Sequence, residues 1–179
     1  GEAMGIERAQ LEGRRVAVIG AGGAARAVVA GFAHYGARVV VYNRTQEKAE
    51  HLAAQFDGSP GQVVAARMDK LCDSCCEVYI NCTPMGMHPE TDQTPVPLAD
   101  GGQPRGWGEG AVVFDTIYNP PVTRLLREAA EAGCTIVSGV EMFVRQGAAQ
   151  FELWTGRDAP LDVFREVMQQ RFGGETDSI

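Results

Sequence analysis

The sequence predicts an α/β fold: a Rossmann-type, doubly wound parallel sheet of six strands with helices on both faces. Short apolar runs rich in β-branched residues alternate along the chain with segments of helical periodicity, which is typical of a parallel sheet. The first apolar run, 15–20, ends in a glycine-rich turn that opens the first helical segment, as in dinucleotide-binding βαβ units. The 179 residues, 45% of them hydrophobic, suffice for one core. We therefore expect the strand order 3-2-1-4-5-6.

The individual elements follow the same alternation in chain order. The first half contains a strand (15–20), a helix (24–35), a strand (38–42), a helix (45–56) and a weak strand (62–65). The second half contains a short helix (68–72), strands at 77–81 and 111–115, a helix (123–132) and a strand (134–138). After the last strand come two helices, 140–154 and 161–172, separated by a cluster of turn residues at 155–160.

The expected domain spans residues 13–172. Residues 1–12 are expected to be a linker or the start of a connecting helix, and residues 173–179 a disordered tail. Between Cys82 and Gly110 lies a Pro- and Gly-rich stretch without periodicity. Loops of this length are uncommon unless they are functional or mobile, so we expect one of these roles for it.

Composition and charge exclude several classes of function. The chain has 16 Lys and Arg against 23 Asp and Glu, a net charge of −7, and its basic residues are scattered, so no nucleic-acid partner is expected. No apolar stretch approaches the length of a membrane span, and no secretory signal is visible. These features favour a cytoplasmic protein without a membrane partner.

The cysteines predict neither disulfides nor a metal site. Their number, five, is odd, and without an export signal reduced thiols are expected. Cys72, Cys75 and Cys76 have the spacing of metal ligands, but no second pair of Cys or His residues completes a site. We therefore expect them to pack as small apolar side chains.

The glycine-rich turn Gly20-Ala-Gly22-Gly23-Ala-Ala25 has the pattern of a dinucleotide fingerprint, with Ala25 in the third glycine position. Gly20 permits the tight turn, Gly22 lets the backbone approach a pyrophosphate, and Ala25 is small enough for close packing of helix on strand. Free N–H groups at the start of the helix would receive the anion. The turn therefore predicts a dinucleotide site, against the alternative of a strand–helix turn without a ligand.

The end of the second strand indicates which dinucleotide is bound. A domain that prefers NAD places Asp or Glu there, about 20 residues after the glycines, to bind the ribose 2′-hydroxyl. This chain has Asn43-Arg44-Thr45 instead. Arg44 can bind a 2′-phosphate as a planar fork, Thr45 can cap the following helix, and Lys48 lies one turn further along it. NADP is therefore the expected cofactor.

Two later segments are expected at the same edge of the sheet. The segment 81–87 follows the fourth strand and should line the nicotinamide side of the crevice with its backbone, and the segment 115–121 follows the fifth strand. Tyr118 places a phenol at the rim, where it can donate to a substrate carboxylate or hydroxyl, or meet water. None of the three histidines has a carboxylate at useful spacing, so none is expected to be a catalytic base.

Five motifs occur together along the chain. They are Gly-Ala-Gly-Gly-Ala-Ala-Arg (20–26), Asn-Arg-Thr (43–45) with Lys48, Asn-Cys-Thr-Pro-Met-Gly (81–86), Asp-Thr-Ile-Tyr-Asn-Pro (115–120) and Gly-Val-Glu-Met-Phe-Val-Arg-Gln (139–146). In this order and spacing the chain resembles the shikimate dehydrogenase family from about residue 12 to residue 172, and its segments 138–143 and 155–160 are similar to the form fused to a 3-dehydroquinate dehydratase. The resemblance implies an NADP-dependent oxidoreductase of aromatic amino acid biosynthesis that reversibly reduces 3-dehydroshikimate to shikimate.

The resemblance also implies which residues form the site. Those that would bind NADP are Gly20, Ala21, Gly22, Gly23, Ala24, Asn43, Arg44, Thr45 and Lys48, with Cys82, Thr83, Pro84, Met85, Thr116, Gly139 and Met142 around the nicotinamide. Those that would contact shikimate are Tyr118 and Gln146. In the family, the Lys–Asp pair that handles the proton lies in an N-terminal domain, and nothing in this chain matches that domain. We therefore expect no catalytic residue here, and a chain that alone binds NADP(H) and turns over little or nothing.

Three other interpretations stay open. A relative that prefers quinate would differ mostly in the unmatched domain. The NADPH domain of glutamyl-tRNA reductase shares the Asn-Arg-Thr signature, although the Asn-Pro-Pro segment at 119–121 and the helix at 140–154 have no role that we can assign in that enzyme. A non-enzymatic nucleotide-binding module would keep the fold without needing a complete site, because fold alone does not establish function.

Overall fold

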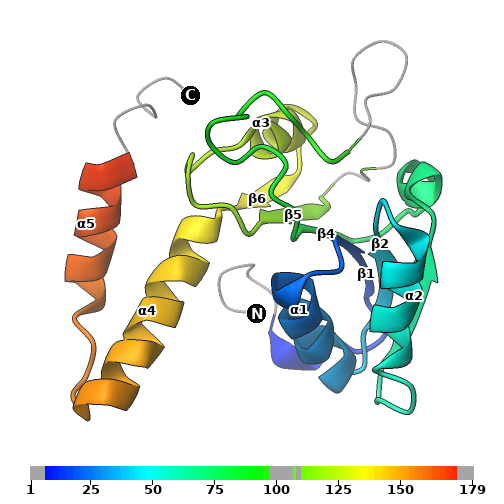
Figure 1. Cartoon of the computed structure of the whole chain (residues 1–179), viewed down its shortest axis with the longest axis horizontal. Helices are drawn as coiled ribbons and strands as arrows, with labels where there is room; N and C mark the ends of the chain where they lie inside the picture. Colours follow the sequence, from blue (N-terminus) through cyan, green and yellow to red (C-terminus); the bar gives the residue numbers. More distant parts are fainter. Residues whose placement is uncertain (1–6, 97–106, 108–109, 173–179) are drawn as a thin grey trace.

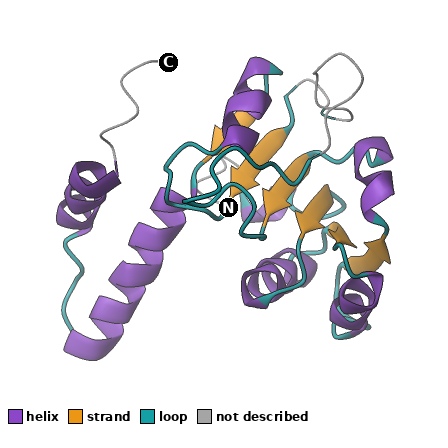
Figure 2. Cartoon of the chain, turned by 45° about the horizontal axis from the view of Figure 1, so that its top comes forward, coloured by secondary structure: helices purple, strands orange, loops and turns teal. Residues whose placement is uncertain are grey.

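The computed structural model describes residues 7–96, 107 and 110–172. These residues form a six-stranded sheet in which neighbouring strands are parallel, in the order β3-β2-β1-β4-β5-β6 (Figures 1 and 2). The predicted fold class and strand order are thus confirmed. The strands are β1 (Arg15–Ile19), β2 (Arg38–Tyr42), β3 (Gln62–Ala66), β4 (Val78–Asn81), β5 (Val112–Asp115) and β6 (Thr135–Val137).

The strand β1 lies in the middle of the sheet because it is apolar on both faces. Val16, Ala17 and Val18 are completely buried, and Ile19 is almost so. Val16 and Val18 belong to one hydrophobic cluster, whereas Ala17 and Ile19 belong to the other. β-Branched side chains suit such a pleated environment, and burial on both faces is the rule for parallel sheets.

Helices cover both faces of the sheet (Figure 1). Val29 of the first helix and Leu52 of the second pack in the cluster of Val16, and Leu71 and Leu125 pack in the cluster of Ala17 on the opposite face. The described helices are the 3₁₀-helices η2 (Arg8–Gln10) and η3 (Met68–Asp73) and the α-helices α1 (Gly23–His34), α2 (Gln46–Ala54), α3 (Arg124–Glu131), α4 (Gly139–Thr155) and α5 (Leu161–Phe172).

The predicted elements are all present and differ mainly at their ends. The strand at 38–42 and the helix at 161–172 have the predicted bounds, whereas the weak third strand continues to Ala66. The short helix predicted at 68–72 is the 3₁₀-helix η3. Within the predicted linker, η2 occupies three residues. The predicted disordered tail 173–179 lies outside the described residues, as do residues 97–106 and 108–109 of the stretch between Cys82 and Gly110.

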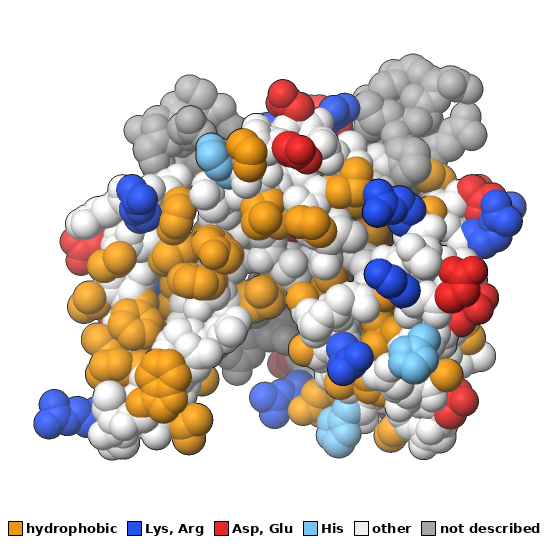
Figure 3. Space-filling model, viewed as in Figure 1, with side chains coloured by type: hydrophobic (Ala, Val, Ile, Leu, Met, Phe, Trp, Pro, Cys, Tyr) orange, Lys and Arg blue, Asp and Glu red, His pale blue; other side chains and the backbone are white. Residues whose placement is uncertain are grey.

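The helices α4 and α5 extend away from the sheet as a pair. α4 begins where β6 ends, Gly156 caps it with a φ of 64°, and α5 returns beside it (Figures 1 and 2). Figure 3 shows hydrophobic side chains gathered over these two helices. Leu153 and Trp154 at the far end of α4 are 82% and 76% exposed. The helices of the described residues include none with the length and hydropathy of a membrane span.

Candidate nucleotide-binding site

The glycine-rich turn lies at the middle of the edge where the parallel strands end. β1 lies between β2 and β4, where the order of the strands reverses, and doubly wound sheets bind ligands at this position. Gly20 has a φ of +112°, and a Cβ there would lie 3.0 Å from the carbonyl oxygen of Cys82. Glycine is therefore required both by the backbone conformation and by the close approach of the segment after β4.

The start of α1 is open to an anion. Gly22 is the N-cap, and no described side chain forms a hydrogen bond at this cap. A Cβ on Gly22 or Gly23 would meet no described atom within 4 Å. Ala25 behind the turn is completely buried, as the third position of the fingerprint requires. Free N–H groups and the helix dipole at such a terminus suit a pyrophosphate.

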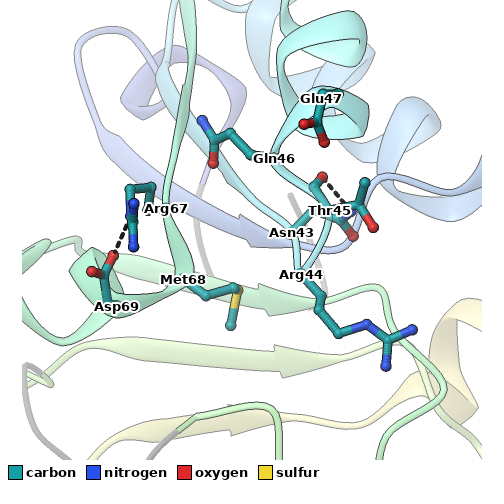
Figure 4. A pocket seen from close by; sticks show the side chains of 8 residues that line it. All are labelled: Asn43, Arg44, Thr45, Gln46, Glu47, Arg67, Met68 and Asp69. Carbon is teal, nitrogen blue, oxygen red and sulfur yellow. Dashed lines mark hydrogen bonds and ion pairs between the residues drawn. The ribbon is translucent and has the colours of Figure 1, made fainter.

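A pocket of about 540 Å³ lies at the ends of β2 and β3, and we call it the β2–β3 pocket (Figure 4). Its volume is in the range of small-molecule sites. One wall is the junction of β2 with α2, and the other is the junction of β3 with η3. The lining residues are Asn43, Arg44, Thr45, Gln46, Glu47, Arg67, Met68 and Asp69.

Three of the four residues predicted to bind the adenosine end of NADP line this pocket. The Asn43 amide donates to the carbonyl oxygen of Thr45 over 2.8 Å, which fixes the turn between β2 and α2. Thr45 is the N-cap of α2, as predicted, but its hydroxyl makes no cap hydrogen bond with the described residues. Arg44 is exposed. Lys48 is exposed on the first turn of α2, outside the described lining.

The second wall of the pocket was not predicted from the sequence. Arg67, Met68 and Asp69 belong to it, and the Arg67 guanidinium donates to the Asp69 carboxylate over 3.2 Å. The available signal was the predicted order of the strands, because neighbouring parallel strands end side by side. Glu47 was missed as well, although its position in the first turn of α2 brings a carboxylate to the pocket.

Polar side chains at the ends of β4 and β5 form a buried cluster that we call the β4–β5 network (Asn81, Thr83, Asp115, Thr116 and Thr123). Asn81 and Asp115 are paired in the sheet register, and both are completely buried. The side-chain amide nitrogen of Asn81 donates to Asp115 Oδ1 over 3.1 Å. The side-chain oxygen of Asn81, Oδ1, accepts from the backbone N–H and the hydroxyl of Thr83.

The other atoms of this network are also bonded. Asp115 Oδ1 accepts from the backbone N–H of Ile117 over 3.0 Å, and Asp115 Oδ2 accepts from the Thr123 hydroxyl over 2.7 Å. The Thr116 hydroxyl donates to the backbone carbonyl oxygen of Asn81. The β4–β5 network therefore ties the two loops that follow β4 and β5 to each other. The position of these segments was predicted from the sequence, but not that Asn81 and Asp115 hold them together.

Burial shifts the pKa of two titratable groups in this region. Burial raises the pKa of the Asp115 carboxyl, against the opposing effect of its hydrogen bonds from Ile117, Thr123 and Asn81. Burial, followed by the charge of Asp115, raises the pKa of Cys82 to about 12. Cys82 is therefore a thiol and not a thiolate nucleophile at neutral pH. Among the described residues, no group of three or more His, Cys, Asp or Glu is placed to hold a metal.

The two residues predicted to contact substrate lie near α4. Tyr118 is 37% exposed, and its ring centroid is 4.3 Å from that of Phe143 in α4 and 5.9 Å from that of Phe172 in α5. Gln146 follows Phe143 by three residues, so the two side chains are neighbours on the same side of α4. The fold thus brings Tyr118 and Gln146, which are 28 positions apart in sequence, to the same helix.

α4 starts directly against the segment after β5 because residue 139 is glycine. A Cβ on Gly139 would lie 2.5 Å from the carbonyl oxygen of Thr116 and would also overlap that of Ile117. Ser138 holds the junction, since its hydroxyl donates to the carbonyl oxygen of Pro121 and accepts from the N–H of Val140. Close packing therefore explains the glycine, and half-buried Met142 follows in the first turn.

Comparison with known proteins agrees with this arrangement. Residues 3–85 match the family described as shikimate/quinate 5-dehydrogenase, and residues 139–169 match the shikimate 5′-dehydrogenase C-terminal domain. The chain belongs to the shikimate dehydrogenase family. The NADP⁺-dependent shikimate dehydrogenase of Methanosarcina mazei is 42% identical to this family member over 163 residues, which are 89% of this chain and 56% of that protein.

Two further relatives show how the domain is used elsewhere. The chloroplastic bifunctional 3-dehydroquinate dehydratase/shikimate dehydrogenase of Arabidopsis thaliana is 41% identical over 160 residues, 89% of this chain and 25% of that protein. The Thermus thermophilus shikimate 5-dehydrogenase, solved in complex with NADP(H) and shikimate, superposes with a TM-score of 0.76 at 32% identity and covers 94% of this chain and 59% of that one. This shikimate dehydrogenase family member thus spans about half the length of the monofunctional relatives.

Proposed function

We propose that this chain is the NADP(H)-binding part of a dehydrogenase that reversibly reduces 3-dehydroshikimate to shikimate. The observation that supports this most directly is the β2–β3 pocket, which has Asn43-Arg44-Thr45 at the end of β2, where an NAD-preferring domain has a carboxylate. The Methanosarcina mazei relative, which is NADP⁺-dependent by name, supports the same cofactor.

In the proposed complex, NADP(H) lies along the carboxyl edge of the sheet. The pyrophosphate binds at the start of α1, and the 2′-phosphate binds in the β2–β3 pocket, with Lys48 near its rim. The residues proposed at the turn are Gly20, Ala21, Gly22, Gly23 and Ala24. The residues proposed around the nicotinamide are Cys82, Thr83, Pro84, Met85, Thr116, Gly139 and Met142.

The bound cofactor would supply the hydride acceptor or donor for the secondary alcohol carbon. The residues of this chain then have to hold the nicotinamide ring and the substrate in the relative orientation that hydride transfer requires. The β4–β5 network supports this role, since it fixes both loops at the proposed nicotinamide side through buried and half-buried hydrogen bonds. Tyr118 and Gln146 are proposed to donate hydrogen bonds to substrate oxygens from the α4 side.

The hydroxyl proton has to be taken up by another group. Of the residues proposed around the nicotinamide, only Cys82 is ionisable, and its pKa of about 12 makes it unsuited to this task. Asp115 is completely buried and bonded within the fold. We infer that the proton is handled by the Lys–Asp pair of the family, in the part of the relatives that this chain does not span.

The apolar surface over α4 and α5 supports the existence of such a second part. Phe143, Leu153, Trp154, Val163 and Val167 are all exposed there, and clustered exposed hydrophobic side chains mark interaction sites. We propose that the remaining part of the dehydrogenase packs on this surface, which would bring its catalytic pair to Tyr118 and Gln146.

Calorimetric titration with NADPH and NADH tests the cofactor assignment. We expect the 179-residue chain to bind NADPH at least tenfold more tightly than NADH, and Arg44→Gln to weaken NADPH binding about thirtyfold, which is about the contribution of a charged hydrogen-bond pair. Arg38→Gln, which removes the same charge at the opposite end of β2, serves as the control and should leave both affinities unchanged. Failure to bind either nucleotide would reject the proposal.

An assay of NADP-linked shikimate oxidation tests the second half of the proposal. The chain alone should show no turnover above background, whereas sustained NADPH formation would place the proton acceptor within these residues. Quinate is the second candidate substrate, because the matched family includes both dehydrogenases. Once a longer chain that includes the proposed second part is available, the ratio of kcat/KM for the two alcohols decides between them.

A further inference from the structure

Two arginines lie at the ends of neighbouring strands, one on each wall of the β2–β3 pocket. β2 and β3 are paired so that Tyr42 lies beside Ala66, and the next residues along each chain, Asn43 and Arg67, therefore leave the sheet side by side. Neighbouring strands are about 4.8 Å apart, so Arg44 and Arg67 start from neighbouring strand ends, although the Arg44 guanidinium is directed away from Arg67 in Figure 4. Figure 4 shows Met68 between the two arginines.

Arg67 is held in the structure by a contact that a ligand can replace. Its Nε lies 3.2 Å from Asp69 Oδ1, and the two side chains are 75% and 58% exposed. Exposed ion pairs of this kind contribute little to stability because water screens them. A phosphate dianion in the pocket would therefore compete effectively with the Asp69 carboxylate for the guanidinium.

An unpaired acceptor lies on the opposite wall of the pocket, at the start of α2. The side-chain oxygen of Gln46 is buried and has no hydrogen-bond partner among the described residues, while its amide nitrogen donates to Glu50. Figure 4 shows this oxygen on the side of the Gln46 side chain that is nearer to Arg67. A guanidinium has five N–H donors, so Arg67 turned into the pocket can contact both a phosphate and Gln46.

We propose that Arg67 is a second ligand of the cofactor 2′-phosphate, which leaves Asp69 when the nucleotide binds and closes on the phosphate from the wall opposite Arg44. The proposal rests on the NADP(H) function proposed above and adds a specificity-determining residue to it. Asp69 then acts as a competitor that holds Arg67 in the free protein and lowers the apparent affinity. Gln46 positions the released guanidinium.

The test compares ligands with and without the 2′-phosphate on the 179-residue chain. Titration of Arg67→Gln with NADPH and with 2′,5′-ADP should show a loss of affinity of about tenfold, whereas NADH and 5′-AMP should change less than twofold. Arg67→Lys, which keeps the charge but loses the planar fork, should recover part of the loss. Asp69→Asn should tighten NADPH binding about twofold to threefold, and this gain should vanish in the Arg67→Gln background.

The matched control is again Arg38→Gln. Arg38 begins β2, roughly 13 Å along the strand from Tyr42, which exceeds the Debye length of about 8 Å, so the same change in net charge should have no effect there. Equal affinities of wild type and Arg67→Gln for NADPH would overturn the inference while leaving the proposed function intact. Equal losses for ligands with and without the 2′-phosphate would also overturn it, because they would indicate a structural role.

Discussion

The β2–β3 pocket and the β4–β5 network lie at the same edge of one sheet, yet they are built in opposite ways. In the pocket, Arg67 and Asp69 are mostly exposed and joined by one ion pair. In the network, Asn81, Asp115 and Thr123 are completely buried and joined by several hydrogen bonds. The exposed ion pair of the pocket can be replaced by another contact at a small cost in free energy. The network cannot lose a hydrogen-bond partner without leaving a buried polar group unpaired.

This difference predicts which substitutions change nucleotide affinity and which change the free energy of unfolding. Substitutions in the pocket should change nucleotide affinity and leave the free energy of unfolding nearly constant. Substitutions in the network should change the free energy of unfolding first. A cofactor that binds along the whole edge would thus meet an adjustable region at its adenosine end and a rigid one at its reactive end, which suits a hydride transfer that depends on orientation.

The largest effect is expected for Asp115→Ala. The change removes the acceptor of three donors, Asn81 Nδ2, the Ile117 N–H and the Thr123 hydroxyl, and each donor left unpaired costs about 1–3 kcal/mol. Part of this is offset because a buried carboxyl is removed, so we expect a net loss of roughly 3–5 kcal/mol in urea unfolding. Asp69→Ala, which removes an exposed carboxylate, should change stability by less than about 0.5 kcal/mol. Similar losses in the two variants would contradict the comparison.

Gly139→Ala should have the next largest effect. The added Cβ would overlap the carbonyl oxygens of Thr116 and Ile117, so α4 must shift, and overpacking of this kind costs about 1–3 kcal/mol. Gly147→Ala in the same helix provides the control. Its Cβ would lie 3.8 Å from Phe164, an ordinary contact, and alanine should stabilise the helix by about 0.5–1 kcal/mol. Thermal unfolding of both variants should show shifts of opposite sign.

The pH dependence of stability should distinguish Asp115 from a half-buried carboxylate outside the network, that of Glu141. Burial raises the pKa of Asp115, so its contribution is greatest below its unfolded pKa of about 3.9 and is lost as the pH rises through the folded pKa. Hydrogen bonding from Arg165 lowers the pKa of Glu141, so that contribution is present above about pH 4.3 and is lost as the pH falls through the folded pKa.

The measurement is urea unfolding of two isosteric variants between pH 3 and pH 7. Relative to wild type, Asp115→Asn should gain stability as the pH rises, and Glu141→Gln should lose it. Each difference also contains a constant offset from altered hydrogen bonds, so the slope is the quantity to compare. Slopes of the same sign would show that burial does not govern the ionisation of Asp115.

The smallest effect is expected for Glu47→Gln. Glu47 lines the β2–β3 pocket, where its charge opposes a bound phosphate through a solvated contact of about 1 kcal/mol or less. Neutralising it should tighten NADPH binding about twofold to threefold without changing the free energy of unfolding. The control is Glu131→Gln, which removes an exposed carboxylate at the end of α3, outside the described pocket lining, and should leave the affinity unchanged. A tighter complex in both variants would point to net charge rather than to the pocket.

Much of the fold and part of the site could be predicted from the sequence. The apolar run 15–20 and the periodic segments after it predicted the six strands, and the glycine turn predicted the junction of β1 with α1. α4 was predicted at 140–154, and it spans Gly139–Thr155. The close contact that requires glycine at position 139 is with a segment 22 residues earlier in the chain, so periodicity within the helix could not reveal it. The β3 wall of the pocket was missed for the same reason.

The sequence by itself determined the sheet order, the helical turns and the presence of Arg44 at the end of β2, because periodicity, glycine spacing and strand ends are local properties of the chain. Only the tertiary structure decided that Arg67 and Glu47 share the pocket with Arg44, that Asn81 and Asp115 meet in a buried network, and that Tyr118 lies against Phe143. These relations depend on which strands are neighbours and where each side chain points, and both are set by packing of the whole sheet and its helices rather than by neighbours in sequence.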